Sequence, residues 1–266
     1  MEELVSKVQK LVEQSKGIWG IVLEDLNSGE KWEHNEQELF YAASVIKVPI
    51  MASVYRAVDR GDLSLMDLII LNEKEYVGGS GVLQHFTPGL SLPLQDIIML
   101  MIIQSDNTAT NLLIDLVGVD DIQNSMKEAG MIYSTFYNKL MLSKSNPKGA
   151  NRIAAVDIAI LLHKMAMGDL VSGKASRQMV EVMKKQQVRD CLPERLPSPY
   201  SNFDYGMTPW ELANKTGWIP GTRHDAGIFY VGNRNLIATV LSKDEDDLLS
   251  KRILAQIGEE IYKYLR

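Results

Sequence analysis

The chain has 266 residues, of which 45% are hydrophobic and 23% charged, a composition typical of a globular protein. The formal net charge of -6 argues against a nucleic-acid-binding protein, because phosphate contacts need a basic surface. The single cysteine, Cys191, excludes an intramolecular disulfide framework, and the scattered histidines show no ligand spacing. We therefore expect neither a metal ion nor a nucleic acid as a partner.

No segment of the sequence is long and apolar enough to span a membrane. The most apolar run, 97–103, is far shorter than the roughly 20 residues that a bilayer requires. The first residues are acidic where a secretory signal is basic, and Lys7, Lys10 and Glu13 interrupt any apolar run. Two locations stay open: the cytoplasm for the chain as given, or an extracytoplasmic location if a signal was removed.

The first predicted elements are a helix, a strand and the return strand of a hairpin. Apolar residues recur at helical spacing over 2–15, and residues 18–23 have the composition of a strand. A turn at Asn27-Ser28-Gly29 then leads to a strand at 31–34.

A long helical region follows, from about 44 to 190. Its candidate helices are 44–60, 93–104, 107–117, 119–129, 153–167 and 175–188. Asp106 or Asn107, and Asp120, are candidate N-caps, and Gly118 and Gly130 are candidate helix ends. The methionines cluster in this region and are interpreted as core residues.

Strands return near Trp218, at 227–232 and at 236–242, and a helix from about 247 to 265 ends the chain. This order predicts an α+β protein in which one lobe is built from both ends of the chain. We expect that lobe to comprise 1–43 and 210–266, and an inserted all-helical lobe to comprise 44–209. The proline-rich segment 192–209 is the candidate crossing between them.

The spacing S-x-x-K occurs three times, at Ser28/Lys31, Ser44/Lys47 and Ser145/Lys148. About one such match is expected by chance in a chain of this size, so the spacing alone carries little weight. The first pair lies at a predicted turn and the last in a polar loop around a proline. We interpret both of these pairs as solvated loop residues.

Ser44 opens an apolar helical run. A serine at a helix start lies beside free backbone N–H groups and the positive end of the helix dipole, which favour a developing anion. Lys47 falls on the same face one turn later. Apolar surroundings lower the pKa of a lysine, so that it can accept a proton from a serine hydroxyl. The alternative is an N-capping serine followed by a surface lysine.

Two further motifs occur once each. Ser105-Asp106-Asn107, between two predicted helices, presents a hydroxyl and a carboxamide suited to proton relay and to binding an amide carbonyl. Lys215-Thr216-Gly217 begins a predicted strand, where lysine and threonine can hold a carboxylate. Taken singly, the first is interpreted as an N-capping turn, and the second is a common tripeptide.

In this order, the three motifs resemble the S-x-x-K, S-D-N and K-T-G triplet of class A β-lactamases and penicillin-binding proteins. The separations, 61 residues from Ser44 to Ser105 and 110 from Ser105 to Lys215, are similar to the class A arrangement. The resemblance covers essentially the whole chain. It implies a transpeptidase-like fold with an antiparallel sheet flanked by the terminal helices, and a serine hydrolase that needs neither metal nor cofactor. A small-molecule substrate with a carboxylate and a monomeric protein are expected.

The resemblance also implies roles. Ser44 is the nucleophile that forms an acyl-enzyme, Lys47 its partner in proton transfer, and Ser105 the relay to the leaving nitrogen. The oxyanion hole is expected to comprise the backbone N–H groups of Ser44 and Trp218.

The remaining roles concern substrate binding. Asn107 is expected to bind the acylamide group, and Lys215, Thr216 and Gly217 the carboxylate end of the substrate. Arg223 is a candidate second cation for that carboxylate; the alternatives are an ion pair with Asp225 and a surface position. Tyr76 is a candidate aromatic wall, or else a packed loop tyrosine.

One departure stands against these matches. Class A enzymes carry a loop glutamate, within E-x-x-L-N, that activates the water for deacylation, whereas residues 131–156 of this chain contain no Asp or Glu. The spacing places the missing acid near 138–142, and the neutral or cationic side chains there cannot act as a general base.

Three functions therefore stay open. The first is a β-lactamase-like serine hydrolase with weak or altered turnover. The second is a D-alanyl-D-alanine peptidase or esterase of the same superfamily, and the third is a covalent penicillin-binding or sensing module without turnover.

Overall fold

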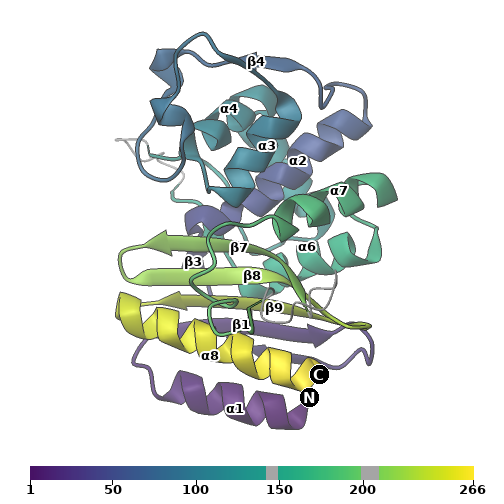
Figure 1. Cartoon of the computed structure of the whole chain (residues 1–266), viewed down its shortest axis with the longest axis vertical. Coiled ribbons are helices and arrows are strands. Elements are labelled where there is room, and N and C mark those ends of the chain that lie inside the picture. Colours follow the sequence, from purple (N-terminus) through teal and green to yellow (C-terminus); the bar gives the residue numbers. More distant parts are fainter. Residues whose placement is uncertain (142–148, 199–209) are drawn as a thin grey trace.

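The computed structural model describes residues 1–141, 149–198 and 210–266. Its centre is a five-stranded antiparallel sheet in the order β2-β1-β9-β8-β7 (Figure 1). The strands are β1 (Ile18–Asp25), β2 (Lys31–His34), β7 (Glu211–Ile219), β8 (Thr222–Val231) and β9 (Arg234–Lys243). Both ends of the chain thus build one sheet, as the sequence predicts, and β7 is an edge strand.

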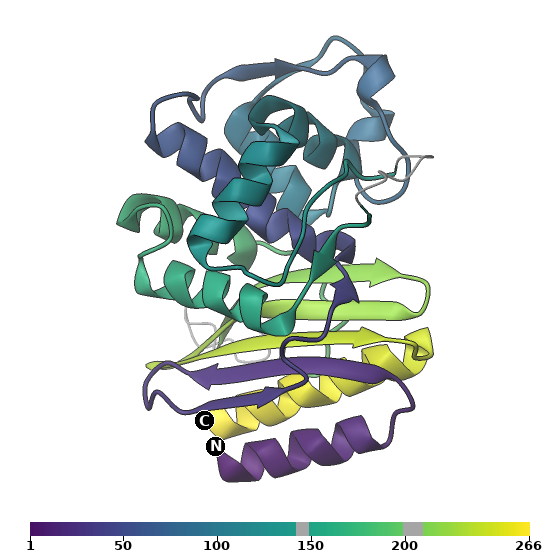
Figure 2. The ribbon, with the colours of Figure 1, turned by 180° about the vertical axis from the view of Figure 1, so that it is seen from behind.

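The terminal helices α1 (Glu2–Glu13) and α8 (Asp247–Leu265) cover one face of this sheet (Figures 1 and 2). The isoleucines at 253, 257 and 261 of α8 recur every four residues, and all are buried. Gly258 lies on this helix where a Cβ would stand only 1.9 Å from the carbonyl oxygen of Leu192. The absence of a side chain there lets the backbone near residue 192 lie directly on α8.

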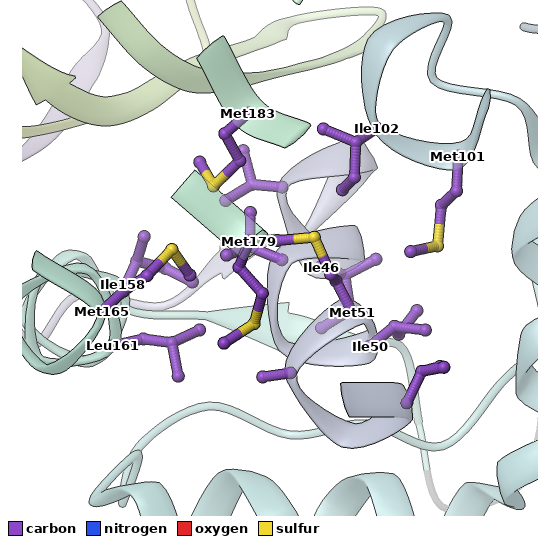
Figure 3. Close-up of a cluster of buried hydrophobic side chains, with 14 of the residues drawn as sticks. Ile46, Ile50, Met51, Met101, Ile102, Ile158, Leu161, Met165, Met179 and Met183 are labelled. Atoms are coloured by element: carbon purple, nitrogen blue, oxygen red, sulfur yellow. The ribbon is translucent and has the colours of Figure 1, made fainter. Parts of the chain in front are cut away.

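Helices α6 (Ala155–Met167) and α7 (Gly173–Lys184) contact the sheet from its other side. Beyond them lie α2 (Lys47–Asp59), α3 (Leu94–Ile103), α4 (Asn107–Val117) and α5 (Val119–Ala129) (Figure 2). Methionine and branched aliphatic side chains from α2, α3, α6 and α7 meet in one cluster beside α2 (Figure 3). Met51, Met179 and Met183 are fully buried in this cluster. These flexible thioether side chains fill the core, as predicted for the methionines, whereas Met66, Met141 and Met167 are exposed.

The helix boundaries follow the predictions closely, with three differences. The helix predicted over 175–188 spans Gly173–Lys184. The helix expected at 44 begins as a 3-10 turn, η1 (Ala43–Ile46), before α2. Asp106 caps α4 as predicted, by accepting a hydrogen bond from the backbone N–H of Ala109, but the residue that precedes α5 is Gly118 and not Asp120. Gly118 (φ 93°) and Gly130 (φ 99°) adopt positive φ angles at helix ends, where a side chain is disfavoured.

Two short strand pairs add to the predicted elements. β3 (Phe40–Tyr41) pairs with β6 (Arg152–Ile153), and β4 (Leu68–Ile70) pairs with β5 (Ser91–Pro93). Two single-turn helices, η2 (Glu73–Glu75) and η3 (Leu83–His85), lie between β4 and β5. The β3–β6 pair joins the residues just before Ser44 to the end of segment 131–156, which contains no Asp or Glu. Within the described ranges, no helix has the length and apolarity needed to cross a membrane.

Candidate active site

The three sequence motifs meet at the amine of Lys47. Its Nζ lies 3.1 Å from Ser44 Oγ, 3.1 Å from Ser105 Oγ and 2.8 Å from Asn107 Oδ1. Lys215 Nζ approaches Ser105 Oγ from the other side, also at 3.1 Å. Ser105 therefore links the two lysines, and we call these five residues the floor of the site.

Backbone geometry fixes the position of Ser44. The preceding residue, Ala43, has a φ of 42°, a left-handed conformation that is uncommon for residues other than glycine. Strand β7 passes directly beside this turn, because a Cβ on Gly217 would lie 3.2 Å from the backbone nitrogen of Ser44. A side chain at 217 would push the strand away from Ser44, which explains the glycine in the K-T-G motif.

Lys47 is fully buried, and the floor around it is buried apart from the partly exposed Ser44. Burial lowers the pKa of its ammonium well below the usual range, and the positive charge of Lys215 lowers it further, against the opposing charge of Asp106. A lysine in these surroundings is readily neutral, and its lone pair can then accept the proton of the Ser44 hydroxyl. The alternative of a surface lysine at 47 is wrong.

Asp106 holds the S-D-N turn against the loop that precedes it. Besides capping α4, its carboxylate accepts hydrogen bonds from the backbone N–H groups of Val82 (2.6 Å) and Leu83 (2.8 Å). Gly81 has no side chain where a Cβ would lie 2.3 Å from this carboxylate. The buried Asp106 therefore fixes the loop over residues 78–83 to the turn that carries Ser105 and Asn107.

Asn107 uses both ends of its carboxamide. The oxygen accepts from Lys47, and Nδ2 donates to the carbonyl of Gly78 at 3.1 Å. The backbone N–H of Asn107 donates to the carbonyl of Ser80 at 3.0 Å. These bonds hold the Asn107 carboxamide between the amine of Lys47 and the loop over residues 78–83.

Lys215 is fully buried on β7 and donates to Ser105 Oγ and to the carbonyl of Thr216. Burial lowers the pKa of Lys215 to about 7, although the nearby carboxyl of Asp225 opposes this shift. Asp225 is itself buried and accepts hydrogen bonds from Asn214 Nδ2 and from the backbone N–H of Leu192. Burial raises the pKa of Asp225 to about 6.

A pocket of about 470 Å³ opens above Ser44 and Asn107. Trp218, Ile219 and Pro220, which follow the K-T-G motif, line one part of it, and residues 138–141, which we call the loop wall, line another. Tyr41–Ala43, Gly79, Ser80, Ala150 and Asn151 complete the lining. No Asp or Glu is among the described residues that line this pocket.

Comparisons with known proteins relate the whole chain to one family. The family model described as "Beta-lactamase enzyme family" matches residues 3–265. The chain belongs to this family. A curated β-lactamase of Rhodobacter capsulatus is 26% identical to it, and the alignment covers 100% of this chain and 89% of the relative.

Solved structures show the same relationship. A β-lactamase from Sphaerobacter thermophilus is 30% identical and superposes with a TM-score of 0.88, over 98% of this chain and 96% of that chain. PBP-A is 26% identical with a TM-score of 0.85, over 98% of this chain and 95% of that chain. The fold is that of β-lactamases and of PBP-A, and the chain is a β-lactamase-like serine hydrolase.

The loop wall lies within the range 138–142, where the resemblance to class A enzymes predicts an acid. Leu140 is fixed to α4 by paired hydrogen bonds, since its backbone N–H donates to Asn111 Oδ1 (2.8 Å) and its carbonyl accepts from Asn111 Nδ2 (3.0 Å). Leu140 lines the pocket with Ser44, so an apolar side chain stands within the range 138–142 expected for the missing acid. The next acid after this range, Asp157, is fully buried and accepts hydrogen bonds from the backbone N–H groups of residues 132–134.

Arg223 does not line the pocket among the described residues. Its guanidinium forms a bidentate ion pair with Asp247 at the start of α8, with Nη2 at 2.8 Å from both carboxylate oxygens, and lies 3.7 Å from Asp190. The two predicted alternatives are wrong, because Arg223 is largely buried and Asp225 is bonded to Asn214 and Leu192. The role of Arg223 as a second cation for the substrate carboxylate stays a prediction.

Tyr76 is also absent from the described lining, and its hydroxyl donates to the carbonyl of Phe86 at 3.1 Å. The alternative of a packed loop tyrosine therefore describes it. Of the other S-x-x-K pairs, Ser28 is an exposed turn residue bonded to Glu30, as expected, and Ser145/Lys148 lies outside the described residues.

His224 is a functional candidate that sequence reasoning missed. It is fully buried on β8 directly across from Gly217. Its Nδ1 accepts a hydrogen bond from the backbone N–H of Ser242, so that Nε2 carries the proton and donates to the carbonyl of Tyr41 at 2.9 Å. Burial lowers the pKa of His224 to about 4, so the neutral ring holds the segment leading to Ser44 against the sheet.

Proposed function

We propose that the chain acylates Ser44 with β-lactams, or with related amides or esters that carry a carboxylate, and that it releases the acyl group slowly. The observation that carries this proposal is the position of Lys47 Nζ, 3.1 Å from the hydroxyls of both Ser44 and Ser105. One buried amine can therefore take the proton of the nucleophile and return it through the relay.

Acylation proceeds in two steps. Ser44 Oγ attacks the carbonyl carbon while its proton moves to neutral Lys47, and the backbone N–H groups of Ser44 and Trp218 stabilise the oxyanion. The C–N bond then breaks as Ser105 delivers its proton to the leaving nitrogen and recovers one from Lys47. The ester bond to Ser44 remains, and water must cleave it to regenerate the hydroxyl.

The substrate carboxylate is assigned to Lys215 and Thr216, and the acylamide group to Asn107. Support for this orientation comes from β7, whose free edge passes Ser44, and from Lys215, which is within hydrogen-bond distance of Ser105. Since Arg223 is bound to Asp247, Lys215 is the cation that we assign to this carboxylate.

Slow deacylation follows from the loop wall. A general base there would need a carboxylate near the acyl bond, and the described pocket lining has none. This absence favours a second candidate, a D-alanyl-D-alanine peptidase or esterase for which β-lactams are slow inhibitors. One similar solved structure is a leucine-to-glutamate mutant of PBP-A, as an acyl-enzyme complex with penicillin-G. It is 26% identical to this chain and superposes with a TM-score of 0.85, over 99% of this chain and 96% of that chain.

A nitrocefin assay combined with intact-mass spectrometry separates the candidates. Slow turnover with a detectable Ser44 adduct supports the proposal. Rapid turnover without an adduct indicates an efficient β-lactamase, and a permanent adduct indicates a binding or sensing module. Fast cleavage of a D-Ala-D-Ala peptide or a thioester beside slow nitrocefin turnover favours the second candidate. Ser44→Ala must abolish every one of these outcomes.

A further inference from the structure

Ser105 and Lys215 approach each other to 3.1 Å although they come from segments far apart in the chain. Ser105 follows the end of α3, and Lys215 lies on β7. The spacing of these two side chains therefore depends on how α3 and β7 are held relative to each other. Helix α7 contacts both of these elements.

Gln186, which follows the end of α7, is buried and bonds to both segments. Its Nε2 donates to the carbonyl of Ile102 at 3.0 Å and to the carbonyl of Asn214 at 3.2 Å. The first carbonyl lies shortly before Ser105, and the second directly before Lys215. One carboxamide nitrogen thus joins the backbones that lead into two of the sequence motifs.

The remaining hydrogen bonds fix the orientation of this carboxamide. Gln186 Oε1 accepts from the backbone N–H of Val188 at 2.9 Å, which turns the nitrogen toward the two carbonyls. Each polar atom of the Gln186 side chain therefore has a partner. Beside it, the backbone N–H of Gln187 donates to the carbonyl of Ile103 at 3.2 Å.

The carbonyls of residues 102 and 103 need such donors. They lie in the last turn of α3, where carbonyls have no intrahelical N–H partner. The chain then turns sharply, because Ser105 has a φ of 53°, a left-handed conformation uncommon for residues other than glycine. Gln186 and Gln187 therefore stabilise the helix end from which this turn starts.

Small shifts of this helix end or of β7 would alter the proton relay. Lys47 Nζ and Lys215 Nζ each lie 3.1 Å from Ser105 Oγ, near the upper limit for such hydrogen bonds. A displacement of about 1 Å would break the bond between Ser105 and Lys215, and a misplacement of this size can lower a catalytic rate by about 10²-fold.

We propose that Gln186 is a positioning residue that holds the S-D-N turn and β7 at the separation at which Ser105 bonds to Lys215. This inference rests on the proposed function, which assigns Ser105 to the proton relay and Lys215 to the substrate carboxylate. Glutamine suits this position because its side-chain amide carries two N–H donors and no charge. An ionised glutamate would turn acceptor oxygens toward the two carbonyl oxygens.

The test removes the donors while keeping the length of the side chain. Gln186→Met should lower the rate constant for acylation of Ser44 by phenylacetylpenicillin by about 10- to 10²-fold. The preference for this penicillin over its methyl ester should also fall, because Lys215 moves relative to Ser105. A general loss of folded protein would instead lower both rates by the same factor and leave the preference unchanged.

Two further variants sharpen this test. Gln186→Asn keeps the carboxamide on a shorter side chain that cannot reach both carbonyls, so an intermediate loss is expected. Gln187→Met is the matched control. The side chain of Gln187 is exposed and donates to the carbonyl of Lys185, and the substitution keeps the backbone N–H, so the rate should stay within about twofold.

A crystal structure of Gln186→Met should show Ser105 Oγ and Lys215 Nζ beyond hydrogen-bond distance. An unchanged distance, an unchanged preference over the methyl ester, or an acylation rate within about twofold of the unaltered protein would overturn the role of Gln186 and leave acylation of Ser44 intact. If no penicillin labels Ser44 of the unaltered protein, the proposed function fails. The distance in the crystal structure then decides by itself whether Gln186 sets the separation.

Discussion

Two adjoining parts of the pocket have opposite chemical character. The floor is buried apart from the partly exposed Ser44, and a chain of hydrogen bonds links its two lysines, two hydroxyls and carboxamide. The loop wall places Leu140 and the exposed Met141 beside the same nucleophile, and it carries no carboxylate. The floor has the nucleophile and the proton acceptor that acylation needs, and the loop wall lacks the general base that deacylation needs. The two halves of a hydrolytic cycle thus depend on different segments of this chain and can be altered separately.

The largest effect is expected when the floor loses its amine. Lys47→Met keeps the length and apolar character of the side chain but removes the proton acceptor, so the rate of Ser44 acylation should fall by about 10²–10⁴-fold. Time-resolved mass spectrometry of the adduct measures this rate. Lys263→Met, at an exposed lysine of α8, is the control. An acylation rate within threefold of the unaltered protein would exclude Lys47 as the proton acceptor.

The converse change gives the loop wall a general base. Leu140→Glu places a carboxylate in the pocket at a backbone position that Asn111 already fixes, and the deacylation rate should rise by about 10²-fold. The acylation rate should change far less. Leu140→Gln introduces a side chain of nearly the same shape as glutamate but without its charge, so the adduct should stay long-lived. If both variants deacylate equally, the missing carboxylate does not explain slow release.

A third prediction concerns the histidine behind the floor. The pKa of His224 is about 4 in the folded protein against an ordinary value of 6.5. Between these values only the unfolded chain binds the proton, so His224 makes the free energy of unfolding fall by about 3 kcal/mol as the pH drops from about 7 to about 4.

The raised pKa of Asp225, about 6, acts in the opposite sense over part of the same range. The difference between the unaltered protein and His224→Gln isolates the histidine, because Asp225 is common to both. Denaturant unfolding at a series of pH values should show that this difference in unfolding free energy shrinks toward pH 4. A difference that stays constant with pH would contradict the neutral, buried ring.

The smallest effect is expected at Lys215. With a pKa of about 7, its ammonium is charged below that pH and neutral above it. The rate of acylation by a penicillin carboxylate should therefore decline several-fold as the pH rises from 7 to 9, relative to the rate with its methyl ester. Stopped-flow profiles of both compounds measure this ratio. A ratio independent of pH would remove Lys215 from carboxylate binding.

The sequence predicts much of the floor and little of the walls. Helical periodicity and glycine positions locate α4 and α5 to the residue, and the three motifs identify side chains that the fold brings within hydrogen-bond distance. Such motifs are readable because each combines a backbone turn with a reactive group. The division into lobes at 43/44 and 209/210, and the monomeric state, stay predictions.

The walls depend on long-range packing that no local pattern encodes. Arg223 could not be assigned because its partner, Asp247, lies 24 residues away on α8. His224 bonds to a carbonyl 183 residues earlier, and Tyr41 belongs to a two-residue strand too short for any periodicity. Single side chains of ordinary type, such as Leu140, gain meaning only when the fold places them beside Ser44.

The lifetime of the ester bond on Ser44 tests most directly whether this protein acylates rapidly and deacylates slowly. The protein is mixed with phenylacetylpenicillin, freed of unreacted ligand, and followed by intact mass together with peptide mapping of Ser44. We predict rapid formation of a single adduct on Ser44 whose decay is orders of magnitude slower than its formation. Rapid consumption of the penicillin without an accumulated Ser44 adduct would contradict this. It would mean that the acyl group leaves Ser44 quickly although the loop wall carries no general base.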